Sequence, residues 1–197
     1  MPRRNLNFAQ HEYYHIYNRG AGRHNLFIEE DNYLYILRQL KKYLAEFSLV
    51  VIAYCLMPNH IHAVVIPACK NALSSFFGKL HHRYARYANC RYEWSGHLWQ
   101  NRFYSVVLDE RHTLVALRYV ERNPVRSGFV VAPEDWQWSS AGGNLGLVDD
   151  PLIPDRPALR IVSDWPSYVS NRENVQELAA LRRVTGTGRP AGDDRFI

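Results

Sequence analysis

The chain has 197 residues, of which 47% are hydrophobic, so it is long enough for one domain with a substantial core. Three cysteines without a closely spaced pair argue against a disulfide framework, and the longest apolar run, Leu49–Met57, is too short to span a bilayer. We therefore expect a cytoplasmic protein that is not inserted in a membrane.

The net charge of +5 is concentrated in the middle of the chain. The segment from Lys70 to Arg126 contains ten Lys or Arg against four Asp or Glu, and its Tyr and Trp residues alternate with arginines. Proteins that bind single-stranded nucleic acid combine cations for the backbone with aromatic side chains for the bases. This segment therefore indicates an anionic, nucleic-acid partner.

The first part of the chain alternates between strand and helix patterns. An aromatic, β-prone run at 13–18 predicts a strand. From Asp31 to Phe47 apolar residues recur every three or four positions, which predicts an amphipathic helix. The stretch 54–66 then predicts a buried strand, a tight turn at Pro58-Asn59, and a second buried strand.

The pattern continues through the basic segment. A second helix is expected over 72–89 and a fourth strand within 98–108. Asp109 is a suitable N-cap for a third helix, which should run to about Asn123 and stop before Pro124. The order β-α-β-β-α-β-α predicts an α+β, ferredoxin-like sandwich whose antiparallel sheet has one face under two helices and the other available for a ligand.

The remaining chain is harder to interpret. We assign 1–142 to the main domain and 143–197 to a C-terminal extension. Within these, 136–140 is expected to form a packed corner, 151–166 a proline-rich loop, 172–183 a short helix, and 186–197 a mobile tail.

His60 and His62 are the first candidate functional residues. Side chains two apart on a strand share a face, so both imidazoles should lie on one side of the sheet, close enough to bind one metal ion. Taken alone, the pair is more often two ordinary packed histidines than a metal site.

Tyr119 and Asn123 are four apart and should share one face of the third helix. A tyrosine that attacks a phosphodiester forms a covalent intermediate, and a divalent ion assists by polarising the phosphate. Because the free pKa of tyrosine is about 10, the positive field of Arg118 and Arg122 is expected to help. By position alone, a core aromatic is the better interpretation of Tyr119, which is one of 13 tyrosines.

Five stretches together resemble a known family: YHIYNRG (14–20), MPNHIH (57–62), GHLWQNRF (96–103), YVERNPVR (119–126) and WQWSS (136–140). In this order and spacing, residues 10–142 resemble the single-tyrosine HUH transposases, specifically the REP-associated tyrosine transposases of the IS200-like superfamily. The resemblance implies an HUH-type ferredoxin-like fold with an extra tyrosine-bearing helix.

The resemblance also implies a function. Such enzymes cut single-stranded DNA beside a hairpin through a 5′-phosphotyrosine intermediate and use Mg²⁺ or Mn²⁺. Tyr119 matches the nucleophile and His60 and His62 match the metal ligands. Asn123 falls where relatives often place a Gln as third ligand. The expected partners are REP-like palindromes, in a bacterial, nucleoid-associated monomer or homodimer.

Several residues are candidates for DNA contacts. Trp99 is expected to stack on a base and Gln100 to read one. The candidate cations are Arg19, Lys79, Arg83, Arg86, Arg102 and Arg126. For any single residue, a solvated cation or a core aromatic is an equally good interpretation.

Two other functions compete with strand transfer. A regulator that binds hairpin DNA without cutting would need none of His60, His62 and Tyr119. A metallohydrolase of small phosphate esters would want more carboxylates near the histidines and would leave the basic, aromatic segment unexplained.

Overall fold

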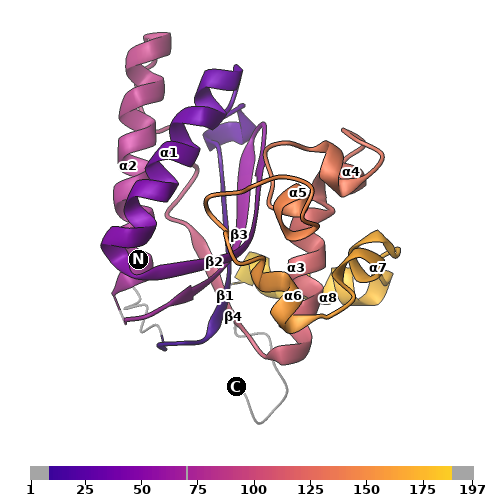
Figure 1. Ribbon diagram of the computed structural model, residues 1–197. Helices are drawn as coiled ribbons and strands as arrows, with labels where there is room; N and C mark the ends of the chain where they lie inside the picture. Colours follow the sequence, from indigo (N-terminus) through magenta and orange to yellow (C-terminus); the bar gives the residue numbers. More distant parts are fainter. Residues whose placement is uncertain (1–8, 70, 188–197) are drawn as a thin grey trace.

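The computed structural model describes residues 9–69 and 71–187. Its centre is one four-stranded antiparallel sheet with the strand order β2-β3-β1-β4 (Figure 1). The strands are β1 (Tyr13–Arg19), β2 (Leu49–Met57), β3 (His60–Pro67) and β4 (Tyr104–Leu108). This order, with helices after β1 and β3, confirms the predicted ferredoxin-like arrangement.

The first two helices cover one face of the sheet. They are α1 (Glu30–Phe47) and α2 (Ala72–Tyr92), and a short 3-10 turn, η1 (Ala21–Arg23), precedes α1. The start of α1 is fixed by Asn32, whose side-chain oxygen accepts the backbone N–H groups of Ile28 at 2.8 Å and Glu29 at 3.1 Å. Tyr33, Ile36 and other members of its apolar stripe are buried against the sheet and α2, as the helical period predicts.

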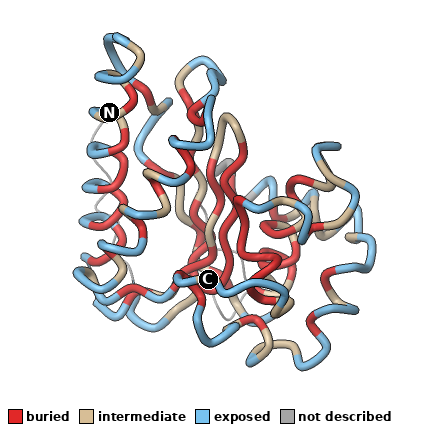
Figure 2. The backbone as a smooth tube through the Cα atoms, turned by 45° about the horizontal axis from the view of Figure 1, so that its top comes forward, coloured by how far each residue is buried: buried red, intermediate tan, exposed pale blue. Residues whose placement is uncertain are grey.

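The opposite face is also covered, which corrects the expectation of a face free for a ligand. Figure 1 shows α3 (Glu110–Glu121) and the C-terminal helices on that side, and Figure 2 shows the buried strands between the two layers. A second hydrophobic cluster joins Val64 and Val106 of the sheet to Leu117 of α3 and to Trp165 and Leu181. The part of this face near the start of β3 borders an open cleft.

The helix that carries Tyr119 begins as predicted but ends earlier. Asp109 caps α3, because its side-chain oxygen accepts the backbone N–H of His112 at 2.7 Å. The helix ends at Glu121, and Pro124 lies in the first turn of a new short helix, α4 (Asn123–Arg126). Proline has no N–H to continue α3 but suits a first turn, so it opens α4 instead of closing α3.

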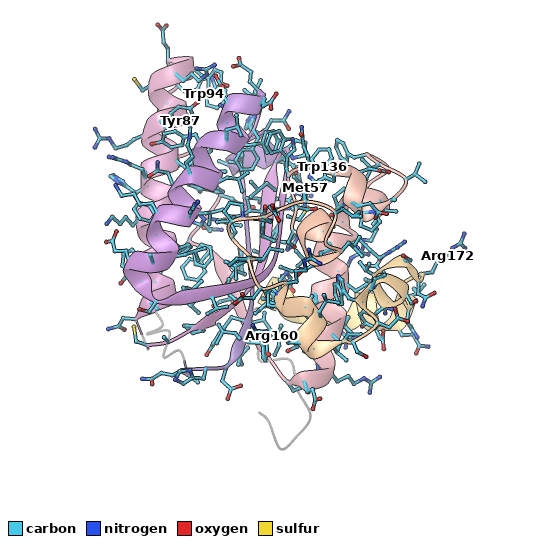
Figure 3. All side chains as sticks on the ribbon, in the orientation of Figure 1. Met57, Tyr87, Trp94, Trp136, Arg160 and Arg172 are labelled. Carbon is cyan, nitrogen blue, oxygen red and sulfur yellow. The ribbon has the colours of Figure 1, made fainter. Side chains whose placement is uncertain are left out.

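The segment around the two tryptophans pairs with β2 and confirms the predicted packed corner. Leu56 N–H donates to Trp138 C=O and Ser140 N–H donates to Tyr54 C=O, each at 2.9 Å. Trp136 lies near Met57 at this end of the sheet (Figure 3). It packs against the second hydrophobic cluster, the one that also contains Val64 and Leu117. The corner is built from η2 (Pro133–Asp135) and α5 (Ala141–Asn144).

The extension is more helical than the sequence suggests. The expected loop at 151–166 contains α6 (Pro157–Ile161) and runs into α7 (Trp165–Ser170). The helix expected at 172–183 is present as α8 (Val175–Thr187), so 186–187 are helical and the rest of the expected tail lies outside the described residues. Short helices with proline in the first turn carry too little periodicity to stand out in a sequence.

One buried carboxylate joins α3 to the chain that follows. Glu121 has no exposed surface and accepts hydrogen bonds from Ser140 Oγ at 2.7 Å, Asn144 Nδ2 at 2.6 Å and Trp165 Nε1 at 3.0 Å. A buried carboxylate is tolerated only with such donors. The tyrosine helix is therefore held from α5 and α7.

Candidate active site

The two histidines of β3 lie side by side on the face that α3 covers. His60 is paired in register with Met57 and Arg19, and His62 with Cys55 and Tyr17. Their ring centroids are 5.1 Å apart with the ring planes nearly perpendicular. The strand spacing thus brings both imidazoles together, as expected.

Tyr119 reaches the same place from α3. Its half-buried ring meets the edge of the His62 ring, with centroids 5.3 Å apart. An open cleft of about 350 Å³ lies beside these rings. We call it the histidine cleft; its lining residues are Tyr17, Arg19, His60, His62, Tyr104, Tyr119, Arg182 and Thr185.

Asn123 also reaches this group in spite of the break between α3 and α4. Its Nδ2 lies 3.0 Å from His60 Nε2. Two ligands at right angles around one ion, each at about 2.1 Å, lie roughly 3.0 Å apart. Rotation of the Asn123 side-chain amide by half a turn would put its oxygen where Nδ2 now lies, 3.0 Å from His60 Nε2. The separation therefore fits two ligands of a single metal ion.

The electrostatics of the pair favour ligation. Burial, reinforced by Arg126 and Arg19, lowers the pKa of His60 to about 4, and burial with the neighbouring His15 holds the pKa of His62 well below its usual value. Both rings are therefore neutral near pH 7, and neutral imidazole is the form that binds metals. Asn59 Oδ1 accepts the Nδ1–H of His60 at 2.6 Å, which leaves the Nε2 lone pair for a ligand.

Two imidazoles and one amide make an incomplete shell. Across residues 9–69 and 71–187, no group of three or more His, Cys, Asp or Glu is arranged to hold a metal ion. A divalent ion here would thus take its remaining ligands from water or a phosphate, as Mg²⁺ commonly does. The residues fit such an ion, with positions left open for substrate.

Arg126 lies against the tyrosine and is not a free surface cation. Its guanidinium carbon is 4.0 Å from the centre of the Tyr119 ring, and its Nη2 donates to the Tyr119 C=O at 3.1 Å. Glu173, in the segment between α7 and α8, pairs with Arg126 at 2.6 Å. Arg126, which the sequence suggested for the DNA backbone, thus has partners within the protein.

The two arginines expected to assist Tyr119 face the extension instead. Arg118 pairs with Glu177 at 3.3 Å and lies over the ring of Tyr168, while Arg122 donates to the C=O groups of Val169 and Ser170. Arg118 lies in α3 and Arg122 directly follows it, and neither lines the histidine cleft. Arg126, one helix further on, is the cation that contacts the Tyr119 ring.

The DNA candidates fall into separate places. Arg19 lines the histidine cleft and its Nε donates to the side chain of Gln100, whose backbone N–H in turn donates to Arg19 C=O at 2.9 Å. Arg83 and Arg86 are exposed on α2. Lys79 is directed toward α1, where it pairs with Glu46 at 2.5 Å, so its charge is already partnered.

A second cleft of about 600 Å³ lies between α2 and the loop 96–103. We call it the α2 cleft. Trp99 lies in its wall, with its ring centroid 4.2 Å from that of His81, and Gln100 and Arg102 line the same cleft. Arg19 and Gln100 therefore connect the α2 cleft with the histidine cleft.

Sequence reasoning missed several members of the site. His15 is completely buried, and its Nε2 lies 2.9 Å from His62 Nδ1. His15 and Tyr17 are two apart in a predicted strand, so their side chains share one face of the sheet. This spacing could have placed His15 on the same face as Tyr17. Thr185 and Glu173 lie in the extension, where no pattern marked them.

A family model described as "Transposase IS200 like" matches residues 9–123, which is more than half of the chain. The chain belongs to the IS200-like transposase family.

Two relatives add detail to this assignment. A Haemophilus influenzae protein with the provisional name REP-associated tyrosine transposase is 30% identical over 101 residues, which cover 45% of this chain and 57% of that protein. The chain thus matches just over half of that relative's length. The solved structure of a REP-associated tyrosine transposase bound to a REP hairpin superposes with a TM-score of 0.60 at 18% identity, covering 74% of this chain and 86% of the other, which supports the fold.

Among the described residues of this IS200-like transposase, no helix is both long and apolar enough to cross a bilayer.

Proposed function

We propose that this chain is a metal-dependent endonuclease and strand transferase that cuts single-stranded DNA beside hairpins. The observation that carries the proposal is that Tyr119 from α3 and His60 and His62 from β3 line one cleft, while the buried Asn123 from α4 contacts His60 behind it. A hydroxyl nucleophile beside a neutral imidazole pair is suited to phosphodiester chemistry.

The metal ion has a defined task in this scheme. His60, His62 and Asn123 would hold Mg²⁺ or Mn²⁺, which when bound supplies Lewis-acid polarisation of a phosphate oxygen. Asn59 orients the His60 ring through the Nδ1 atom of His60, and His15 orients the His62 ring through the Nδ1 atom of His62.

Tyr119 performs the covalent step. Its oxygen attacks the phosphorus and loses its proton, while the bond to the 3′-oxygen of the preceding nucleotide breaks and that oxygen takes up a proton from water. The products are a 5′-phosphotyrosine and a free 3′-OH. Attack by a 3′-OH reverses the step and rejoins the strand. Arg126 holds the ring in place and adds positive charge beside the phenol.

The DNA would lie along the α2 cleft toward the histidine cleft. Trp99 and Arg102 offer a stacking surface and a backbone cation there, and Arg83 and Arg86 extend the positive charge along α2. A structural neighbour binds a REP hairpin. We infer that a REP-like hairpin is the partner here.

One experiment separates cutting from binding. The protein is incubated with Mn²⁺ and a labelled single-stranded hairpin oligonucleotide and analysed on a denaturing gel. A covalent protein–DNA band is expected, absent in Tyr119→Phe and His60→Ala. Tyr35→Phe, which removes a hydroxyl from the α1–α2 contact at a residue that lines neither cleft, is the matched control and should retain the band.

The alternatives predict other outcomes. A band that persists in Tyr119→Phe would show that the nucleophile is a different residue. Tight hairpin binding without any covalent band would favour the non-cutting regulator.

A further inference from the structure

A buried chain of hydrogen-bonding groups joins α8 to His62. Thr185 Oγ1 lies 2.8 Å from Leu181 C=O and 3.1 Å from His15 Nδ1. His15 Nε2 lies 2.9 Å from His62 Nδ1. His15 is completely buried and His62 and Thr185 are 4% and 9% exposed, so the chain is nearly closed to water.

The direction of these bonds follows from the Thr185 hydroxyl. A threonine within a helix commonly donates to the C=O four residues earlier, here Leu181, and its oxygen is then left to accept. His15 must therefore place its single N–H on Nδ1, toward Thr185. Its Nε2 has no hydrogen and accepts from His62 Nδ1.

The consequence appears at the cleft. A neutral imidazole carries one N–H, so His62, which donates from Nδ1, keeps a lone pair on Nε2. Only a nitrogen with a lone pair binds a metal ion. Had Thr185 donated to His15, the whole order would reverse and His62 Nε2 would carry a hydrogen.

We propose that Thr185 and His15 form a positioning relay that fixes the tautomer of His62, so that α8 takes part in building the metal site. Neither residue is one of the proposed metal ligands, His60, His62 and Asn123. His60 reaches the same tautomer through its chain neighbour Asn59, whereas His62 depends on a helix 123 residues further along the chain. The metal part of this inference rests on the proposed function; the tautomer does not.

The matched variants are Thr185→Val, which keeps the shape and removes the hydroxyl, and Thr185→Ser, which keeps the hydroxyl. Nitrogen NMR of histidine side chains in metal-free protein reports which ring nitrogen of His62 carries the hydrogen. We expect one tautomer, with Nδ1–H, in the wild type and in Thr185→Ser, and a mixture in Thr185→Val.

Mn²⁺ affinity measured by calorimetry is the second readout. Loss of a group that orients a ligating histidine typically weakens metal binding about 10- to 100-fold. We expect Thr185→Val near the low end, about tenfold, and Thr185→Ser near wild type. If valine disturbs α8, Thr185→Ala, which favours helix, replaces it.

The outcomes separate the two ideas. An unchanged His62 tautomer in Thr185→Val would overturn the relay, and so would equal losses in the valine and serine variants, because these would point to packing. If the wild type binds no Mn²⁺, the proposed metal site fails, and the tautomer comparison still decides the relay.

Discussion

At the scale of single residues, the site depends on side chains that orient other side chains. Arg126 is the clearest case. Its guanidinium group contacts the Tyr119 ring and donates from Nη2 to the Tyr119 C=O, while Nη1 of the same group pairs with Glu173. Arg126 lies 15% exposed, so its charge is only partly screened by water. The ring of Tyr119 is thus positioned by a residue that the sequence suggested for DNA.

Replacing Arg126 with Met should slow strand cleavage and leave hairpin affinity near wild type. A partly desolvated cation–π contact is worth about 1–2 kcal/mol, which corresponds to roughly tenfold in rate. Single-turnover cleavage and fluorescence anisotropy measure the two quantities. Arg86→Met, on the exposed side of α2, is the control. It should weaken hairpin binding and leave the single-turnover cleavage rate near wild type. A purely affinity-based loss in Arg126→Met would argue against positioning.

Glu121 makes stability depend on pH. Burial raises the pKa of its carboxyl to about 7, against a usual value of 4.5, although Asn144, Ser140 and Trp165 oppose the shift. A raised pKa in the folded state means that the contribution to stability is full below pH 4.5 and is lost as pH rises through 7, at up to about 1.4 kcal/mol per pH unit.

Denaturant unfolding between pH 5 and 8 tests this sign. The free energy of unfolding of the wild type should fall with rising pH relative to that of Glu121→Gln, which cannot titrate here. Parallel curves for the two proteins would rule out a titrating Glu121.

At the scale of elements, the extension behaves as part of the core. Trp165 is completely buried with Leu181 in the cluster behind α3 and donates to Glu121. Trp165→Ala should lower the free energy of unfolding by about 3–5 kcal/mol. Trp94→Ala, at a residue 39% exposed, should cost about 1 kcal/mol or less. Similar costs for both would mean that α7 is not packed as described.

The sequence predicted the elements that have strong local patterns. The apolar period in α1, the two buried strands around Pro58-Asn59 and the Asp109 cap all correspond to local physics. The predicted end of α3, at about Asn123, is two residues later than the observed end at Glu121, and the short helix α4 that Pro124 helps to start was not predicted. Contacts such as Thr185 with His15 join positions 170 residues apart, and no local pattern encodes them.

At the scale of the whole molecule, we propose that the two clefts and the exposed arginines of α2 form one surface for DNA. Arg102 is exposed in the α2 cleft and lies in the loop that carries Trp99 and Gln100. Neutralising a phosphate contact to single-stranded DNA removes about 0.7 from the slope of log affinity against log salt. Arg102→Ala should show this decrease in a salt titration of hairpin binding.

Arg38→Ala is the control for that titration. Arg38 is equally exposed but lies on α1, beside a different surface. Its loss changes the net charge by the same amount and should leave the slope unchanged. An equal decrease in both variants would mean that net charge, and not a DNA path over the α2 cleft, sets the salt dependence.

We propose above that Tyr119 becomes covalently joined to DNA. Mass spectrometry of the trapped adduct after trypsin and nuclease digestion tests it directly, because cleavage after Arg118 and Arg122 releases Tyr119 in the peptide 119–122, apart from the other tyrosines of the cleft. We expect a 5′-phosphonucleotide on that peptide. A nucleotide found instead on a peptide containing Tyr17 or Tyr104 would contradict the assignment of Tyr119 as the nucleophile.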